Sequence, residues 1–391
     1  MDERKLRDIR SDIAYLKDKI YVDNAAVTPV PERVRLASEH YNTIIAEQLR
    51  DAKEASKPYF EKGRALAAKL VGSSPENVAY VQNTSHGLSL VALGVDWRPG
   101  DNLVVCAQEF PSNYLCWVQL AARGVEVRQI SSPDGRLEPD QIRSALDSRT
   151  RVVALSHVQF YSGFRADIST LGALCSEFGA MLVVDGTQSI GAIDLDVGAT
   201  GVDVLVVSAH KWLMGPRGIG FATFSDRALR EITPQIVGWL SVNDPFAFHR
   251  TLDFLPDARR FEPGTANGCG ILGLAERLAQ IDELGIEWIE NRVLYLNELL
   301  CETALRHGIQ PVHQFEPRSR SGITLLRKPG IGAAELHSAL TAQGVYASIR
   351  NGAIRLSPHY YNTVEEMEEI VSIMVSAGGQ TNERHAVSFS R

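Results

Sequence analysis

Short apolar runs rich in valine, isoleucine and leucine recur along the first part of the chain. They cover residues 77–81, 103–106, 126–130, 151–155, 181–184, 203–207 and 219–224. Several runs are apolar throughout and do not alternate with polar residues, which is typical of strands buried on both faces of a sheet. Helical patterns lie between many of them, at 88–93, 113–122, 139–146 and 169–178. This order predicts an α/β sheet covered by helices.

The pattern changes from about residue 271. A long helical stretch to about 307 is followed by an apolar run at 323–326, a helix at 333–343, short strands at 345–349 and 353–356, and a last helix at 364–375. This order predicts a compact α+β unit. We therefore expect a large domain over 21–270, a small domain over 271–377 that includes the N-terminal segment 1–20, and a polar, flexible tail over 378–391.

Composition narrows the classes of function. The chain has 391 residues and a net charge of −7, which disfavours nucleic acid or an anionic membrane as a partner. No stretch approaches the roughly 20 apolar residues of a membrane span, and the charged N-terminus lacks the apolar core of a signal peptide. The five cysteines form no C-x-x-C pair and no histidine motif suggests a metal, so we expect no metal site and a cytoplasmic location.

Polar residues at strand ends are the first candidates for chemistry, because open α/β sheets bind ligands at the carboxyl ends of their strands. Asp185 ends one apolar run and Lys211 follows the next. Each alone has an ordinary explanation, since the acid can cap a turn and the lysine can extend to the surface. Together they match pyridoxal 5'-phosphate, which needs a lysine amine for a Schiff base and an acid at its ring nitrogen.

A phosphate group also needs a binding site. The segment Asn83-Thr84-Ser85-His86-Gly87 follows a strand and opens an apolar helical run. Backbone N–H groups at a helix N-terminus attract anions, and the Ser85 hydroxyl can donate a further hydrogen bond. The alternative is a plain helix cap by Thr84 or Ser85.

These segments together resemble the class V aminotransferase family of fold-type I pyridoxal-phosphate enzymes. The family includes cysteine desulfurases, kynureninase and isopenicillin N epimerase-like proteins. The resemblance runs from Tyr21 to Ser357 and rests on five ordered motifs: Tyr21-Val22-Asp23-Asn24-Ala25-Ala26, Val184-Asp185-x-x-Gln188, Ser208-Ala209-His210-Lys211, Arg260-Phe261-Glu262-x-Gly264-Thr265, and Arg355-x-Ser357 before Tyr361-Asn362-Thr363.

The resemblance implies a mostly parallel seven-stranded sheet, a smaller α+β domain, and a homodimer with shared active sites. It implies roles for the following residues: Lys211 as the Schiff-base lysine that moves the α-proton, Asp185 at the ring nitrogen, Gln188 near the phenolic oxygen, Ser85, Ser208, His210 and the backbone of His86 at the phosphate, and Thr265 at the phosphate of the neighbouring subunit. Arg355 would pair with the α-carboxylate of an amino-acid substrate.

Three positions depart from the family pattern. Phe110 stands where desulfurases carry histidine, and it can either stack on the cofactor ring or belong to the core. Phe160 occupies a position that often holds asparagine, with Gln159 as a candidate replacement. The loop 346–354 contains no cysteine, whereas a desulfurase needs a thiol there to accept sulfur.

The type of reaction stays open at this point, because transamination, epimerisation and β-elimination share their first chemical step. We expect an amino-acid aminotransferase, with a β-eliminating C–S lyase or an epimerase as alternatives. Asn24, Trp239 and Tyr361 are candidates for the substrate pocket. A non-catalytic scaffold that kept the fold would be expected to lose Lys211, Asp185 or Arg355, and all three are present.

Overall fold

A computed structural model describes residues 3–248 and 250–377 of the chain. The tail expected over 378–391 lies outside the described residues. Within them the main sheet has seven strands in the order β2-β8-β7-β6-β5-β3-β4. Their bounds are Val78–Val81 (β2), Asn102–Cys106 (β3), Glu126–Ile130 (β4), Thr150–Ser156 (β5), Met181–Asp185 (β6), Val204–Ser208 (β7) and Gly220–Phe224 (β8). Strand β8 runs antiparallel to both of its neighbours and the other adjacent pairs are parallel, so the expected mostly parallel sheet is confirmed.

Burial on both faces explains why the central strands read as continuous apolar runs. Successive side chains of a strand point to opposite faces. In β6 and β7, Leu182 and Leu205 belong to one hydrophobic cluster, whereas Val183 and Val206 belong to another on the opposite face. Each face therefore needs its own apolar residues, and no polar position is left in between.

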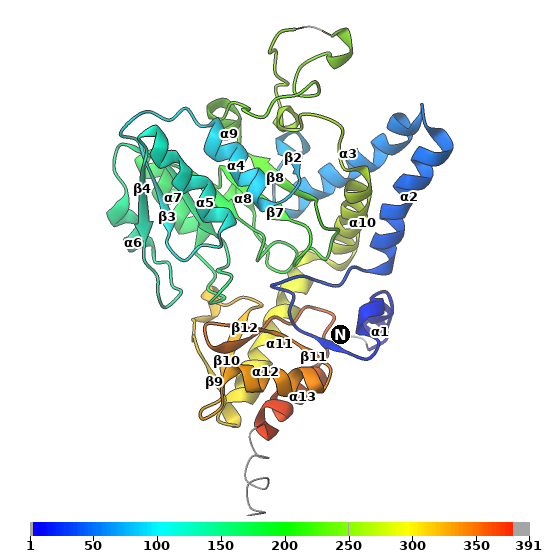
Figure 1. The fold of residues 1–391 in the computed structure, drawn as a ribbon, viewed down its shortest axis with the longest axis vertical. Helices are drawn as coiled ribbons and strands as arrows, with labels where there is room; N and C mark the ends of the chain where they lie inside the picture. The colour runs from blue at the N-terminus through cyan, green and yellow to red at the C-terminus, as the bar shows by residue number, and fades with distance from the viewer. Residues whose placement is uncertain (1–2, 249, 378–391) are drawn as a thin grey trace, which may run out of the picture.

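Helices cover both faces of the sheet (Figure 1). Helices α4 (Thr84–Gly94), α5 (Ser112–Val118) and α9 (Asp226–Glu231) contribute to the cluster that contains Val206. Helices α3 (Ala52–Leu70), α6 (Pro139–Ala145), α7 (Ile168–Phe178) and α10 (Gly268–Leu284) contribute to the cluster that contains Leu205. Helix α2 (Glu32–Gln48) packs against α3 and α10, and the short α8 (Val197–Thr200) packs against α7.

The C-terminal part forms a second α+β unit with its own core. Its antiparallel sheet has the order β12-β13-β10-β9. Its elements are α11 (Ile286–Arg306), β9 (Gln310–Pro311), β10 (Thr324–Arg327), α12 (Ala333–Ala342), β11 (Val345–Tyr346), β12 (Ser348–Arg350), β13 (Ala353–Leu356) and α13 (Val364–Ser376). The N-terminal segment contains α1 (Glu3–Ser11) and β1 (Ile20–Tyr21), and β1 pairs in parallel with β11.

The long helical stretch expected from residue 271 is two helices that meet at Gly285, whose φ of +83° lies in the region that favours glycine. Helix α10 packs against α2 and α3 beside the main sheet, whereas α11 packs against α13 and β9. The expected domain boundary near 271 therefore falls inside α10. We propose that the boundary lies at Gly285.

Candidate active site

The carboxyl ends of β5, β6 and β7 open into a cavity of about 300 Å³. Its lining comes from four parts of the chain: the N-terminal residues Ala25 and Ala26, the main sheet and its loops, the starts of α4 and α5, and the β12–β13 region of the small unit. Most of the residues expected from the sequence line it: Ser85, Phe110, Asp185, Gln188, Ser208, His210, Lys211 and Arg355. Asn24, His86 and Thr265 are not among its lining residues.

Asp185 and Lys211 lie at the end of β6 and just beyond β7. Asp185 is buried and accepts a hydrogen bond from the backbone N–H of Thr187 at 2.9 Å, while burial raises the pKa of its carboxyl group. Burial lowers the pKa of Lys211 to about 8, with the charge of Asp185 opposing the shift. The lysine Nζ lies over the ring of Phe110, 5.1 Å from its centroid. More of this amine is therefore neutral and nucleophilic near neutral pH than of an ordinary lysine, although the protonated form still predominates at pH 7.

The start of α4 presents polar groups to the same cavity. The Thr84 N–H donates to Ser208 Oγ at 2.8 Å, and Ser85 Oγ donates to Ser112 Oγ at 2.7 Å. The N–H of His86 is already bound to Asn83 Oδ1 at 2.9 Å, and its ring Nδ1 accepts from the N–H of Gln82. The geometry therefore does not support the expected phosphate contact from His86. Thr84, for which the sequence indicates at most a helix cap, lines the cavity.

Gly87 explains why α4 can start so close to the strand ends. A Cβ at this position would lie 2.5 Å from Cγ1 of Val206 on β7. Such an approach is closer than carbon atoms tolerate. The absence of a side chain at residue 87 thus lets the helix N-terminus reach the cavity.

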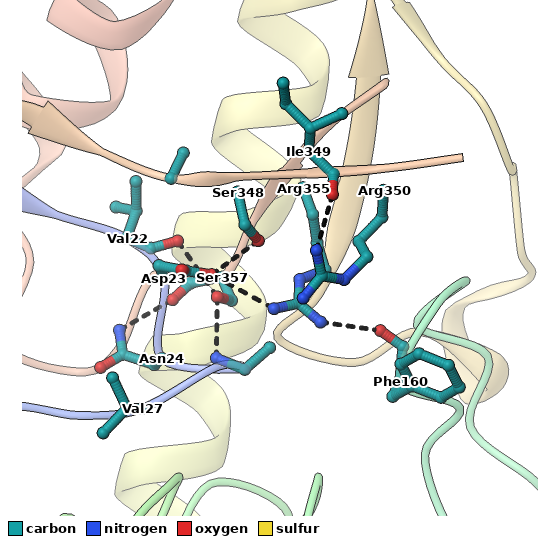
Figure 2. A network of polar contacts seen from close by, with 12 residues as sticks. Val22, Asp23, Asn24, Val27, Phe160, Ser348, Ile349, Arg350, Arg355 and Ser357 are labelled. Carbon is teal, nitrogen blue, oxygen red and sulfur yellow. Dashed lines mark hydrogen bonds and ion pairs between the residues drawn. The ribbon is translucent and has the colours of Figure 1, made fainter. Parts of the chain in front are cut away.

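Arg355 lies on β13 and is 1% exposed (Figure 2). One terminal nitrogen is 3.2 Å from Asp23 Oδ1 and the other donates to the carbonyl oxygen of Phe160 at 3.1 Å. Asp23 Oδ1 also accepts from Ser348 Oγ at 2.8 Å. The Arg355 Nε is buried without a hydrogen-bond partner. A buried guanidinium that lines a cavity and keeps an unused donor is suited to bind an anion.

Asp23 was not predicted as a functional residue, although it lies within a motif that carries the family resemblance. Its partner is 332 positions away in the sequence, so no local pattern indicates the ion pair. Glu109 was missed as well. It is a buried carboxyl whose pKa is raised to about 7, foremost by burial, and it accepts from the N–H of Ser156 at 2.8 Å. Because Ser156 lines the cavity, Glu109 helps to position that strand end.

The two glutamines considered for the phenolic oxygen both form hydrogen bonds with other groups of the protein. Gln188 donates to the carbonyl oxygen of Ala25 at 3.0 Å and accepts from Trp212 Nε1 at 2.9 Å. Gln159 donates to Glu109 at 2.7 Å and is not among the cavity residues, whereas Phe160 lines the cavity and packs edge-on against Phe110. Gln188 therefore remains a candidate through its second amide hydrogen, and the geometry does not support Gln159.

The remaining candidates lie outside the cavity. Asn24 is buried, donates to the carbonyl oxygen of Ser357 at 2.8 Å and accepts from the Tyr361 hydroxyl at 2.8 Å. These bonds attach the N-terminal segment to the small unit, so the geometry does not support Asn24 or Tyr361 as substrate ligands. Thr265 and Trp239 are exposed in the single chain. The role of Thr265 in a neighbouring subunit therefore stays a prediction.

The cavity fits pyridoxal phosphate. It joins a buried acid, a lysine amine and a polar helix start, and these groups match the ring nitrogen, the aldehyde and the phosphate of that molecule. The described residues hold no cluster of histidine, cysteine or acidic side chains suited to a metal. None of the described helices has the length and apolar character needed to cross a membrane.

Comparisons with known proteins also indicate a pyridoxal-phosphate enzyme. Residues 20–370 match the model of the family "Aminotransferase class-V". A "Probable cysteine desulfurase" of Methanothermobacter thermautotrophicus is 30% identical, over 93% of this chain and 96% of that protein. The apo structure of a cysteine desulfurase from Thermococcus onnurineus NA1 superposes with a TM-score of 0.86 at 26% identity, covering 95% of this chain and 97% of the other.

A second similar structure is that of C-DES, described as a cystine C-S lyase in complex with cysteine persulfide. It has a TM-score of 0.87 at 22% identity, with 94% of this chain and 100% of the other covered. Another structure of C-DES carries glycine covalently linked to its pyridoxal-phosphate cofactor. At this identity the likeness concerns the fold. The family model matches residues 20–370, which is most of the chain, and the solved structures share its fold. The chain therefore belongs to the class V aminotransferases, a family of pyridoxal-phosphate-dependent enzymes of fold type I.

Proposed function

We propose that the protein is a pyridoxal-phosphate-dependent lyase that cleaves the C–S bond of a cysteine-type amino acid by β-elimination. The sequence alone favoured an aminotransferase. The similar proteins are instead named cysteine desulfurases, which act on a C–S bond, so the lyase alternative now takes first place. The observation that carries the proposal is a single cavity lined by Lys211, Asp185 and Arg355 and by no cysteine.

The residues that would hold the cofactor follow from their places around the cavity. Asp185 would hold the proton of the ring nitrogen, and Lys211 would bond the aldehyde carbon. The start of α4, together with Ser208 and His210, would bind the phosphate. Phe110 would cover the ring, which agrees with its position beside Lys211 Nζ. Bound in this way, pyridoxal phosphate draws electron density from the α-carbon of the amino acid and acidifies its C–H bond.

Two side chains would then act on the substrate. The Arg355 guanidinium would bind the α-carboxylate, with the unused Nε as one donor, and so fix the α-carbon relative to the lysine. The Lys211 amine would accept the α-proton, which suits a pKa of about 8 because a base is most effective when its pKa is near the working pH. As the Cα–H and Cβ–S bonds break, a Cα–Cβ double bond forms and the electron pair leaves with sulfur.

The fate of the sulfur atom separates this reaction from that of a desulfurase. All five cysteines lie within the described residues, and none lines the cavity. Cys106, Cys116 and Cys175 are buried, and burial raises each thiol pKa to about 12. The loop between β12 and β13 consists of a tight turn at Asn351 and Gly352. Sulfur is therefore expected to leave as a small thiol and not as a persulfide on the enzyme.

The test is product analysis of the holoenzyme with cysteine, cystine and S-alkyl cysteines, with and without a keto-acid acceptor. The proposal expects pyruvate and ammonia, independent of the acceptor, together with hydrogen sulfide from cysteine, a persulfide of low molecular weight from cystine, or a thiol from an S-alkyl cysteine. Alanine with a protein-bound persulfide would indicate a desulfurase. A new amino acid that forms only when the acceptor is present would restore the aminotransferase.

A further inference from the structure

A second arginine, Arg350, lines the same cavity as Arg355. It ends β12, which pairs with β13 in a register that places Arg350 opposite Ala353. Figure 2 shows its side chain extending toward the same region as that of Arg355. Burial is the main cause that lowers the pKa of Arg355 and of Lys211, and the positive charge of Arg350 adds to both shifts.

The charge of Arg350 is not balanced by the protein. Within residues 3–248 and 250–377 no acidic side chain forms an ion pair with it, and its guanidinium donates to the carbonyl oxygen of Ile349 at 2.7 Å. Asp23 is paired with Arg355 and is bonded to Ser348. In the proposed function Arg355, already paired with Asp23, binds the α-carboxylate, and the amino group of the substrate lies at the cofactor. Arg350 is then a second cation in the cavity, and a second acidic group on the substrate would pair with it.

We propose that Arg350 determines substrate specificity by binding a second acidic group, so that the preferred substrate is an α-amino acid whose side chain ends in a carboxylate. This inference rests on the proposed C–S lyase only for the position of the sulfur. With that reaction, the acidic group would belong to the leaving thiol, as in S-carboxymethylcysteine. The thiol would leave with the electron pair of the Cβ–S bond and take up a proton, and no oxidant or reductant is needed.

The alternative to a specificity role is that Arg350, which is exposed, is an ordinary solvated arginine at the rim of the cavity. Binding separates the two explanations without relying on turnover. Glutamate and glutamine have nearly the same shape, differ in one charge, and carry no leaving group at the β-carbon. Calorimetric titration of the holoenzyme with each would give two dissociation constants. We expect glutamate to bind roughly tenfold more tightly, as befits one charge-assisted hydrogen bond.

The variant Arg350→Gln should reduce this preference to near unity by weakening glutamate binding alone. Arg306→Gln is a matched control, because Arg306 is exposed in the same unit, is not a cavity residue, and the variant changes net charge equally. Arg350→Lys should keep part of the preference. Equal weakening of both ligands in Arg350→Gln would assign Arg350 to the α-carboxylate and overturn the proposal, as would an unchanged preference.

A second experiment tests whether Arg350 also selects the substrate of the proposed β-elimination. Pyruvate formation is compared for S-carboxymethylcysteine and its amide, S-carbamoylmethylcysteine, in wild type and Arg350→Gln. The ratio of their kcat/KM values should fall about tenfold in the variant, because differences between the leaving groups cancel when the two enzymes are compared. Absence of pyruvate from every substrate would refute the proposed lyase while leaving the glutamate preference as a separate result. A ratio that does not change would overturn the role of Arg350.

Discussion

Replacing Gly87 by alanine tests whether the close approach of α4 to β7 shapes the phosphate site. The new Cβ would lie 2.5 Å from Val206 Cγ1, so helix and strand must separate by about 1 Å to reach ordinary contact. Overpacking of this kind costs about 1–3 kcal/mol, while alanine in a helix gains about 1 kcal/mol over glycine. The net expectation is a loss of about 0–2 kcal/mol in the free energy of unfolding.

Gly87→Ala should raise the free energy of unfolding, and not lower it, when Val206 is also replaced by alanine. Without its methyl groups, the nearest side-chain atom of residue 206 to the new Cβ is Val206 Cβ at 3.5 Å, which is ordinary contact. In that background Gly87→Ala should stabilise the protein by up to about 1 kcal/mol, because only the helix propensity remains. Val206→Ala alone should destabilise it by about 2 kcal/mol through lost burial and a cavity.

Urea unfolding of the apo protein gives the four free energies of this double-mutant cycle. Titration with pyridoxal phosphate, followed by absorbance, gives the cofactor affinity. We expect Gly87→Ala to weaken binding at least about tenfold, since displaced N–H and O–H donors no longer meet the phosphate. The double variant should recover much of that affinity. The reasoning fails if Gly87→Ala leaves stability and affinity unchanged, or if it destabilises both backgrounds equally.

Four further predictions concern the site and the assembly. Asp185→Asn should retain the cofactor but lose most of its turnover, since an amide cannot hold the charge at the ring nitrogen; turnover equal to wild type would remove Asp185 from that role. Lys211 should carry the pyridoxyl label after borohydride reduction. Because only the deprotonated amine attacks an aldehyde, covalent capture of the cofactor by apo protein should accelerate as pH rises through about 8 and then level off; a rate that keeps rising toward the ordinary lysine pKa of about 10.4 would contradict this shift. Arg355→Ala should lower kcat/KM for α-amino acids by the equivalent of about 2–5 kcal/mol, and unchanged kinetics would exclude it as the carboxylate ligand. Sedimentation equilibrium should find a homodimer in which Thr265→Ala weakens cofactor affinity; a fully active monomer would rule out the shared site.

The sequence predicted the central strands of the sheet well because they are buried on both faces, whereas the edge strand β4 is only partly buried. Each of the seven apolar runs corresponds to a strand, with ends shifted by at most a residue or two. Helices α2 and α3 were not anticipated. In α2 the buried apolar residues are Val34 and Ile44, which is too sparse a stripe to show a helical period. Elements that pack on other helices at the edge of the fold thus leave a weak signal.

The site was predicted where its residues follow strands and missed where it depends on distant contacts. Lys211 and Asp185 are found from their position after apolar runs. Asn24 and His86 sit within the right motifs, yet their polar groups bond to nearby backbone or to Tyr361 and not to the cavity. A motif gives the position of a residue but not the direction of its side chain. A role for Asp23 and Arg350 can be inferred only from the folded structure, in which the small unit lies beside the strand ends.

The pairing of β1 with β11 has a consequence for how the protein is made. Ile20 pairs with Val345, and the cavity takes residues from Ala25 to Arg355. During synthesis β1 therefore has no strand partner until β11, near the end of the chain, has left the ribosome. Contacts that span so much sequence form slowly, because the entropy of closing the chain is lost before any contact is gained. The nascent chain cannot assemble the complete cofactor pocket early, and a fragment that ends before β11 would leave β1 without its strand partner.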